Sequence, residues 1–184
     1  MALTESTMLE LGTHAPDFAL TDVTTGKQVR RDDFRGKALL VMFICTHCPY
    51  VKHIEKTLGK LGRDYADKPL AIVAISSNDA ATHPEDRPEG LKAQAEAHGF
   101  PFPYLYDETQ DVARAYKAAC TPDPFLFDAN HKLVYRGQYD SSRPGNGVPV
   151  TGEDLRAAMD AVLAGKPVSK DQRPSIGCNI KWRG

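Results

Sequence analysis

Hydrophobic and polar positions alternate along the chain in a way that predicts strands separated by helices. The apolar run over residues 38–44 predicts a strand that is buried on both faces, and residues 70–75 predict a second one. Between them, residues 49–66 carry apolar side chains at every third or fourth position, which predicts an amphipathic helix with one face on the core.

The middle of the chain continues the alternation in shorter elements. Residues 77–90 are rich in Asp, Pro and Thr, and we expect them to form a surface excursion. Residues 89–98 predict a helix that ends at Gly99, because glycine readily adopts the left-handed conformation that caps a helix. Another short helix is predicted over residues 109–118.

A hairpin and one more helix are predicted in the last third of the chain. Residues 124–128 and 133–138 predict two strands joined by a short polar turn. The last helix is expected to begin at Thr151, whose side chain can cap the amides near Asp154, and to end before Gly165.

Strands that alternate with helices and then form a hairpin imply a mixed α/β sheet that is covered on both faces. We expect one domain over residues 1–184, with a core at about 12–165 and a C-terminal tail at 166–184. Apolar residues return in this tail between Ile176 and Trp182, so the tail is expected to dock on the body.

Composition fits one globular domain and excludes several classes of function. Hydrophobic residues make up 41% of the 184 positions, which is enough for an ordinary core. Lys and Arg number 23 against 24 Asp and Glu, so the chain lacks the basic field that nucleic acid or an anionic membrane would require. The longest apolar stretch is too short to cross a bilayer, and the first residues do not resemble a secretory signal. We therefore expect a cytoplasmic protein.

Two of the four cysteines, Cys45 and Cys48, follow the first predicted strand directly and stand where the next helix begins. The free amides and the dipole at a helix N-terminus stabilise a thiolate, which is the reactive form of cysteine. A separation of three residues brings both sulfurs to one side of the first helical turn. We predict that Cys45 is the exposed nucleophile and that the more buried Cys48 resolves the mixed disulfide.

Other uses of such a cysteine pair fit the sequence less well. Haem attachment needs a histidine directly after the second cysteine, where this chain has Pro49. A structural zinc site needs two further ligands, and the candidates form no second cluster. These candidates are Cys120, Cys178, His47 and His53. A non-catalytic zinc-binding or redox-sensing module is the alternative from another class; we expect neither a metal nor a cofactor.

Several segments together resemble the redoxin branch of the thioredoxin superfamily, the alkyl hydroperoxide reductase and thiol-specific antioxidant family. They are residues 15–18 (APDF), 34–37 (FRGK), 120–128 (CTPDPFLFD) and 175–182 (SIGCNIKW). The resemblance implies a thioredoxin-like three-layer α/β/α sandwich with a mixed central sheet and an N-terminal extension. It also implies a thiol–disulfide oxidoreductase whose partners are protein or small-molecule thiols and disulfides.

The resemblance further implies that the peptide bond between Thr121 and Pro122 is cis and lies beside the active cysteines. The backbone before this proline would pair with an extended substrate and hold the substrate's disulfide against Cys45. Thr46 and His47, which lie between the two cysteines, would set the reduction potential of the pair. A cationic His47 would stabilise a thiolate, so we expect a reduction potential less negative than that of thioredoxin, about −270 mV.

The chain also departs from its relatives at informative positions. Peroxiredoxins have Pro and Thr seven and three residues before the peroxide-reactive cysteine, and this chain has Ala38 and Met42 at those distances from Cys45. Thiol-dependent reduction of hydroperoxides is therefore the weaker alternative. Thioredoxin has a buried acid where this chain has Leu39, so proton removal from the second cysteine would fall to another base, such as His47 or His53, or to water.

The two remaining cysteines are candidates for additional redox roles. Cys120 lies two residues before the predicted cis-proline, and packing inside the sheet is the simpler interpretation for it. Cys178 lies in the tail, which could carry it to Cys45 or Cys120 as a third redox cysteine. The alternative is that Cys178 only packs beside Trp182.

Overall fold

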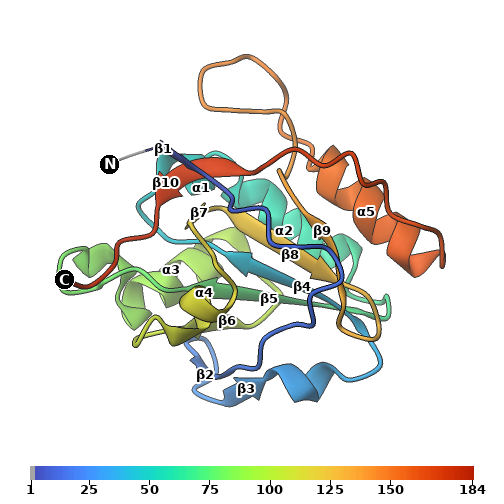
Figure 1. The fold of residues 1–184 in the computed structure, drawn as a ribbon. Helices are drawn as coiled ribbons and strands as arrows, with labels where there is room; N and C mark the ends of the chain where they lie inside the picture. The colour runs from blue at the N-terminus through green and yellow to red at the C-terminus, as the bar shows by residue number, and fades with distance from the viewer. Residues whose placement is uncertain (1–2) are drawn as a thin grey trace.

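A mixed sheet of seven strands forms the centre of the protein (Figure 1). The computed structural model describes residues 3–184. In their order across the sheet, the strands are β3 (Gln28–Arg30), β2 (Ala19–Asp22), β6 (Tyr104–Tyr106), β5 (Leu70–Ser76), β4 (Ala38–Phe43), β8 (Asp123–Phe127) and β9 (Leu133–Arg136). β4, β5 and β6 run parallel, while the remaining neighbours are antiparallel. The predicted mixed sheet is confirmed.

Helical layers cover both faces of this sheet, as the sequence predicts. One face carries α1 (Pro49–Lys52), α2 (Glu55–Asp64), α3 (Pro88–His98) and α5 (Glu153–Leu163). The other face carries α4 (Asp111–Ala115) together with the N-terminal segment. Two short 3-10 helices, η1 (Arg31–Phe34) and η2 (Pro84–Asp86), lie in the connections.

Strand β4 shows why the apolar run near its start forms a fully buried strand. Successive side chains of a strand point to opposite faces, so Leu40 and Met42 pack under one helical layer. Leu39, Val41 and Phe43 pack under the other layer. Every residue of β4 is therefore buried, and the strand delivers the chain to the cysteines from the centre of the sheet.

The helix predicted over residues 49–66 is two helices, α1 and α2. The amide of Ile54 bonds to the carbonyl of Val51, three residues earlier, so the last turn of α1 tightens. Ile54 then takes φ −112°, outside the helical range, and α2 begins at Glu55. The prediction was correct about the apolar face and wrong about continuity.

Helix ends differ from the prediction where the backbone takes left-handed conformations. Gly99 has φ 61° and caps α3, as predicted. Lys117 has φ 52°, so the helix predicted over 109–118 is only the short α4. Helix α5 begins at Glu153 rather than at Thr151, because Gly152 takes φ 71° and the Asp140 carboxylate accepts its amide hydrogen at 2.8 Å.

A second, small sheet joins both ends of the chain to the body. It consists of β1 (Leu3–Glu5), β10 (Ile176–Asn179) and β7 (Cys120–Thr121), with β10 in the middle and both pairs antiparallel. The tail therefore returns to the body through β10. Ile180 is buried after it, whereas Trp182 remains 41% exposed.

The segment 77–90 is only in part the surface excursion that its composition predicts, because residues 81, 82, 84, 85 and 87–89 are exposed and others are buried. Ser77, Asn78, Asp79 and Asp86 are all buried, and Asp86 is completely so. They are buried because each of their polar groups finds a hydrogen-bond partner inside the fold, which removes the cost of desolvation. The segment packs beside the cysteines.

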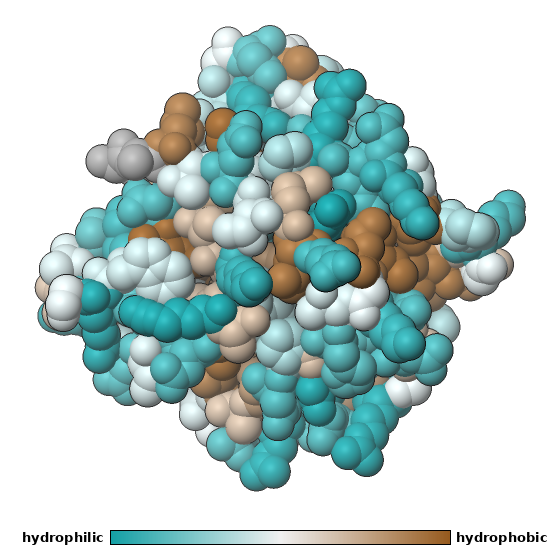
Figure 2. Space-filling model, viewed as in Figure 1, coloured by the Kyte–Doolittle hydropathy of each residue, from teal (hydrophilic) through white to brown (hydrophobic). Residues whose placement is uncertain are grey.

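The surface of the protein is largely hydrophilic in the view of Figure 2, with apolar side chains gathered near α5. Val162 and Leu163 of α5 line a pocket together with Val168. Within residues 3–184, none of the helices has the length and apolar character needed to cross a membrane.

Candidate active site

Cys45 and Cys48 lie at the end of β4, and both side chains are 0% exposed. The expectation of an exposed Cys45 is therefore wrong. Thr121, from the small sheet, covers the pair: its hydroxyl lies 3.5 Å from the Cys45 sulfur and its carbonyl oxygen lies 3.5 Å from the Cys48 sulfur. Both cysteines are thiols in this structure.

The N-terminus of α1 lies at Cys48 rather than at Cys45. Cys48 is the N-cap residue of α1, and Pro49 is the first helical residue. Thr46 and His47 form the bend between β4 and this helix, and the Thr46 amide donates to Asp86 instead of to a sulfur. The positive end of the helix therefore faces Cys48, which corrects the expected stabilisation of a Cys45 thiolate by helix amides.

The two thiols are hydrogen-bonded to each other, and this contact separates their acidities. The pKa of Cys48 is lowered to about 4, mainly because the Cys45 thiol donates to its sulfur, with further contributions from Cys178 and Thr121. The pKa of Cys45 is raised by the same hydrogen bond, by burial and by the nearby Asp86 carboxylate. The pair therefore loses its first proton easily and its second with difficulty, as two coupled acids do.

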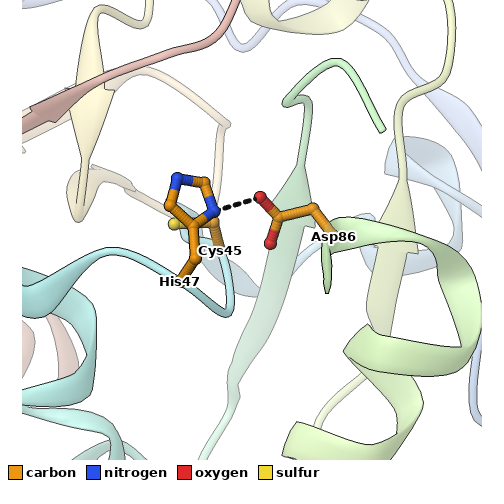
Figure 3. A group of neighbouring side chains, drawn as sticks. All are labelled: Cys45, His47 and Asp86. Atoms are coloured by element: carbon orange, nitrogen blue, oxygen red, sulfur yellow. Dashed lines mark hydrogen bonds and ion pairs between the residues drawn. The ribbon is translucent and has the colours of Figure 1, made fainter. Parts of the chain in front are cut away.

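Asp86 is a member of the site that the sequence did not reveal. It comes from η2, and its carboxylate lies against the bend between the cysteines (Figure 3). One oxygen accepts hydrogen bonds from the Thr46 amide at 2.8 Å and the Thr46 hydroxyl at 2.7 Å. The other accepts from His47 Nδ1 at 2.5 Å and from Asn78 Nδ2 at 3.0 Å.

These hydrogen bonds keep the buried Asp86 carboxyl ionised. Burial by itself would raise the pKa of Asp86, but the hydrogen bonds from His47, Thr46 and Asn78 outweigh it and lower the pKa below 3.8. The amide oxygen of Asn78 in turn accepts a hydrogen bond from the backbone of Lys181 at 2.8 Å. The C-terminal tail is thus connected to the active-site bend through Asn78 and Asp86.

No signal in the sequence marks Asp86 as part of this site. It belongs to an acidic, proline-containing segment, and such segments are usually solvated loops. Its partners Thr46 and His47 stand about 40 positions earlier in the chain. Only the packing of η2 against the end of β4 brings them together.

The peptide bond between Thr121 and Pro122 is cis, as the family resemblance implies. The strand β10 pairs with one edge of the backbone before the proline, so that Cys178 stands opposite Thr121 and Asn179 opposite Cys120. β7 is an outer strand of the small sheet. Pairing of a substrate strand with the backbone before the proline stays a prediction.

Cys178 lies beside Cys48 and hydrogen-bonds to its sulfur. Burial raises the pKa of the Cys178 thiol to about 12, and the contact with Cys48 adds to this effect. Trp182 lies elsewhere, with the Arg114 guanidinium 4.8 Å from the centre of its ring. The tail therefore brings a third thiol to the cysteine pair.

Cys120 and His53 are less closely connected with the pair. The Cys120 thiol donates to the carbonyl oxygens of Pro122 and Ser175, and burial raises its pKa. These contacts agree with packing inside the small sheet. The His53 ring lies 2.7 Å from the Ser142 hydroxyl through Nε2, at the base of the loop before α5.

A buried acid exists near the site, although Leu39 is apolar. Asp123 follows the cis-proline directly and is completely buried. Its Oδ2 accepts the Ala119 amide at 3.1 Å, while its Oδ1 has no hydrogen-bond partner among residues 3–184. Burial raises the pKa of Asp123 to about 7.

One group of side chains combines the ligand types that metals use. The Cys45 sulfur, a His47 ring nitrogen and an Asp86 oxygen all lie within 4.8 Å of one another. Zinc accepts all three types. Here, however, the Asp86 carboxylate already accepts hydrogen bonds from Thr46, His47 and Asn78.

The mixed sheet, the helices on both faces, the cysteine pair at the end of β4 and the facing cis-proline define a thioredoxin-like protein. The sequence profile of the AhpC/TSA family matches residues 11–136, and the chain belongs to this family. Thiol-disulfide oxidoreductase ResA of Geobacillus kaustophilus (strain HTA426) is 31% identical over 130 residues, which are 71% of this chain and 70% of that protein. ResA of Geobacillus thermodenitrificans (strain NG80-2) is 30% identical over the same shares.

Solved structures agree with this assignment. An uncharacterized conserved protein from Geobacillus kaustophilus is 58% identical, with a TM-score of 0.97 over 100% of this chain and 97% of that chain. A hypothetical protein from Sinorhizobium meliloti 1021 is 53% identical, with a TM-score of 0.96 over 98% of this chain and 99% of that one. The thioredoxin domain of a thiol-disulfide oxidoreductase from Bacteroides vulgatus is 26% identical, with a TM-score of 0.60 over 70% of this chain and 88% of that one.

Proposed function

We propose that this protein is a thiol–disulfide oxidoreductase in which Cys45 and Cys48 form the redox couple. The observation that carries the proposal is the pair of hydrogen-bonded thiols held under Thr121 and Pro122. Two sulfurs in contact can form a disulfide with little rearrangement. The low pKa of Cys48 supplies the thiolate that resolves the mixed disulfide at neutral pH. Family membership and the names of the ResA relatives support the same activity.

In the oxidation of this couple, Cys45 attacks a substrate disulfide as a thiolate. A bond forms between the Cys45 sulfur and one substrate sulfur, while the substrate's own disulfide breaks and releases one thiolate. The Cys48 thiolate then attacks the Cys45 sulfur, and the second substrate thiolate leaves. The protein loses two electrons and the substrate gains them. Starting from dithiol substrates, the same steps run in reverse.

Both sulfurs are buried, so exchange requires a local opening that uncovers Cys45. The bend at Thr46 and His47 is the part of the site that reaches the surface, since both residues are half-buried. Thr121 is covered by β10. We therefore infer that a disulfide approaches Cys45 from the side of the bend.

Trapping of mixed disulfides tests the proposal. Cys48→Ser should accumulate a covalent adduct with insulin or with oxidised glutathione, because the resolving sulfur is absent. Cys45→Ser should form no such adduct, and the matched control Cys120→Ser should exchange like the unaltered protein. Exchange that persists without Cys45 would refute the assignment. Consumption of hydrogen peroxide that depends on Cys45 would point instead to the peroxidase alternative.

We also propose that Cys178 is a third redox cysteine. Its thiolate would attack the Cys48 sulfur of a Cys45–Cys48 disulfide, forming a Cys48–Cys178 disulfide and releasing Cys45, with no net gain or loss of electrons. The contact between Cys178 and Cys48 supports this step. Mass mapping of the oxidised protein should find both disulfides; finding only Cys45–Cys48 would reject the step.

Cytoplasmic location stays a prediction that cell fractionation can check.

A further inference from the structure

The imidazole of His47 is held in one orientation by the Asp86 carboxylate (Figure 3). An ionised carboxylate only accepts hydrogen bonds, so the proton of this contact is on Nδ1 of the ring. The other nitrogen, Nε2, is buried and has no hydrogen-bond partner among residues 3–184. His47 is therefore fixed in the form in which Nε2 can accept a proton.

The chemistry of the cysteine pair creates a need for such an acceptor. Cys48 takes the first negative charge of the pair, so Cys45 still carries its proton when a disulfide arrives. If the Cys48 thiolate removed that proton, Cys48 would no longer be the thiolate that the second step requires. A separate base beside Cys45 avoids this conflict. A ring nitrogen of His47 lies within 4.8 Å of the Cys45 sulfur, which places this imidazole beside the thiol that must lose a proton.

We propose that Asp86 is a positioning residue that makes His47 the proton acceptor and donor for Cys45, a role that rests on the disulfide exchange proposed above. The Cys45 proton moves to Nε2 and leaves a thiolate beside an imidazolium. The thiolate attacks the substrate disulfide, and the departing substrate thiolate takes the proton from Nε2. Cys48 remains a thiolate throughout and then closes the intramolecular disulfide. Each proton and each electron pair is accounted for without another reactant.

The charged and titratable groups around His47 favour this role. Asp86 is on its Nδ1 side, and Glu85 is 3.9 Å from the same nitrogen, so two carboxylates can stabilise an imidazolium. The ring of His83 stacks on the ring of His47 with 4.8 Å between the centres, and a second cation there would act in the opposite direction. Of these groups only Asp86 is completely buried and bonded to the ring.

Two substrates with different leaving groups separate this role from a structural one. An Asp86→Asn variant keeps an oxygen for Thr46 but presents an amide hydrogen to Nδ1, so Nε2 would carry the proton and could not accept one. Its rate with hydroxyethyl disulfide, which releases an ordinary alkyl thiolate, should fall by about 100-fold. Its rate with dithiobis(nitrobenzoate), which releases an already stable thiolate, should fall much less. The dependence of the rate on pH should also differ between this variant and the unaltered protein.

Two further variants keep the test decisive. Asp79→Asn changes another buried acid of the same segment, which bonds to Ala81 and Thr82 rather than to the imidazole, and should leave both rates within about twofold. His47→Gln should reproduce the Asp86→Asn effect, and the double variant should be no slower than either single one. Equal losses on both disulfides with an unchanged pH profile would overturn the role of Asp86. Absence of exchange in the unaltered protein would instead overturn the proposed function.

Discussion

Two buried acids near the cysteines differ because their hydrogen bonds differ. Asp86 receives four hydrogen bonds and stays ionised, whereas one oxygen of Asp123 has no partner among residues 3–184. Burial therefore raises the pKa of Asp123 to about 7. Whether a buried carboxyl group is ionised thus depends less on its depth than on the hydrogen-bond donors around it.

The raised pKa of Asp123 predicts a pH-dependent stability. The folded protein retains a proton up to about pH 7, whereas the unfolded chain releases it near pH 3.8. The proton on Asp123 therefore adds to the free energy of unfolding, and this contribution is fully present below pH 3.8. It is lost as the pH rises through about 7, at about 1.4 kcal/mol for each pH unit between the two pKa values.

Asp123→Asn should therefore flatten the dependence of the unfolding free energy on pH between about 4 and about 8. It should also make the protein more stable than the unaltered chain at about pH 8. Urea denaturation of both proteins at several pH values checks this. Parallel curves for the two proteins would show that Asp123 does not titrate in this range.

The position of His47 beside the cysteines lets us predict the reduction potential of the Cys45–Cys48 couple relative to that of thioredoxin. The imidazolium that forms when His47 accepts the Cys45 proton stabilises the thiolate and so favours the reduced form, which makes the potential less negative than about −270 mV. His47→Pro removes this imidazole and should lower the potential. Equilibration in glutathione buffers followed by alkylation of the free thiols measures both values. A potential at or below about −270 mV in the unaltered protein, or no change on substitution, contradicts the electrostatic argument.

At the scale of elements, the sequence predicts those that depend on local pattern. The apolar run of β4 and the start and cap of α3 are encoded in consecutive residues, so they were correctly predicted. β7 and β10 are short, and each depends on pairing with strands that lie far away in the chain. The position of η2 against the active-site bend is equally non-local, which is why the sequence pointed to Cys45 and Cys48 but not to Asp86.

The pairing of β10 with β7 depends on the absence of a side chain at Gly177. A Cβ atom there would lie 1.9 Å from the carbonyl oxygen of Thr121 and 2.7 Å from its carbonyl carbon, and both are backbone atoms. Gly177→Ala should therefore displace β10 and lower the free energy of unfolding by about 3 kcal/mol or more. Gly184→Ala is the matched control, because nothing lies within 4 Å of that position.

Hydrogen exchange gives a second measurement for the same change. The amides of β10 should exchange faster in Gly177→Ala than in the control, and alkylation of Cys48 should accelerate because Cys178 and Thr121 no longer cover it. Protection of these amides equal to that in the unaltered protein would contradict the proposed fit.

At the scale of the whole molecule, an apolar cluster covers each face of the central sheet. The C-terminal tail is hydrogen-bonded to the active-site bend through Asn78 and Asp86. Leu58 packs in the cluster under α2, and Phe127 in the cluster on the opposite face. Trp182, the single tryptophan, reports on the tail, while circular dichroism reports on the sheet. Because the tail is linked through Asn78 to Asp86, we expect both signals to change in one cooperative transition.

Leu58→Ala should shift that transition as a whole. It removes a completely buried side chain and should lower the free energy of unfolding by about 2–5 kcal/mol, with equal shifts in the fluorescence and circular dichroism midpoints. Val148→Ala, at a position that is 41% exposed, serves as the control and should change the midpoint little. Separate midpoints for the two probes would show that the tail melts independently.

The small sheet has a practical consequence for work with this protein. Because β1 pairs with β10 and β10 brings Cys178 beside Cys48, an affinity tag or fluorescent fusion that disturbs this pairing would also disturb the cysteines. A label inserted near Gly145, where open space surrounds the backbone, avoids this interference. Activity assays on end-tagged material should be compared with protein from which the tag has been cleaved.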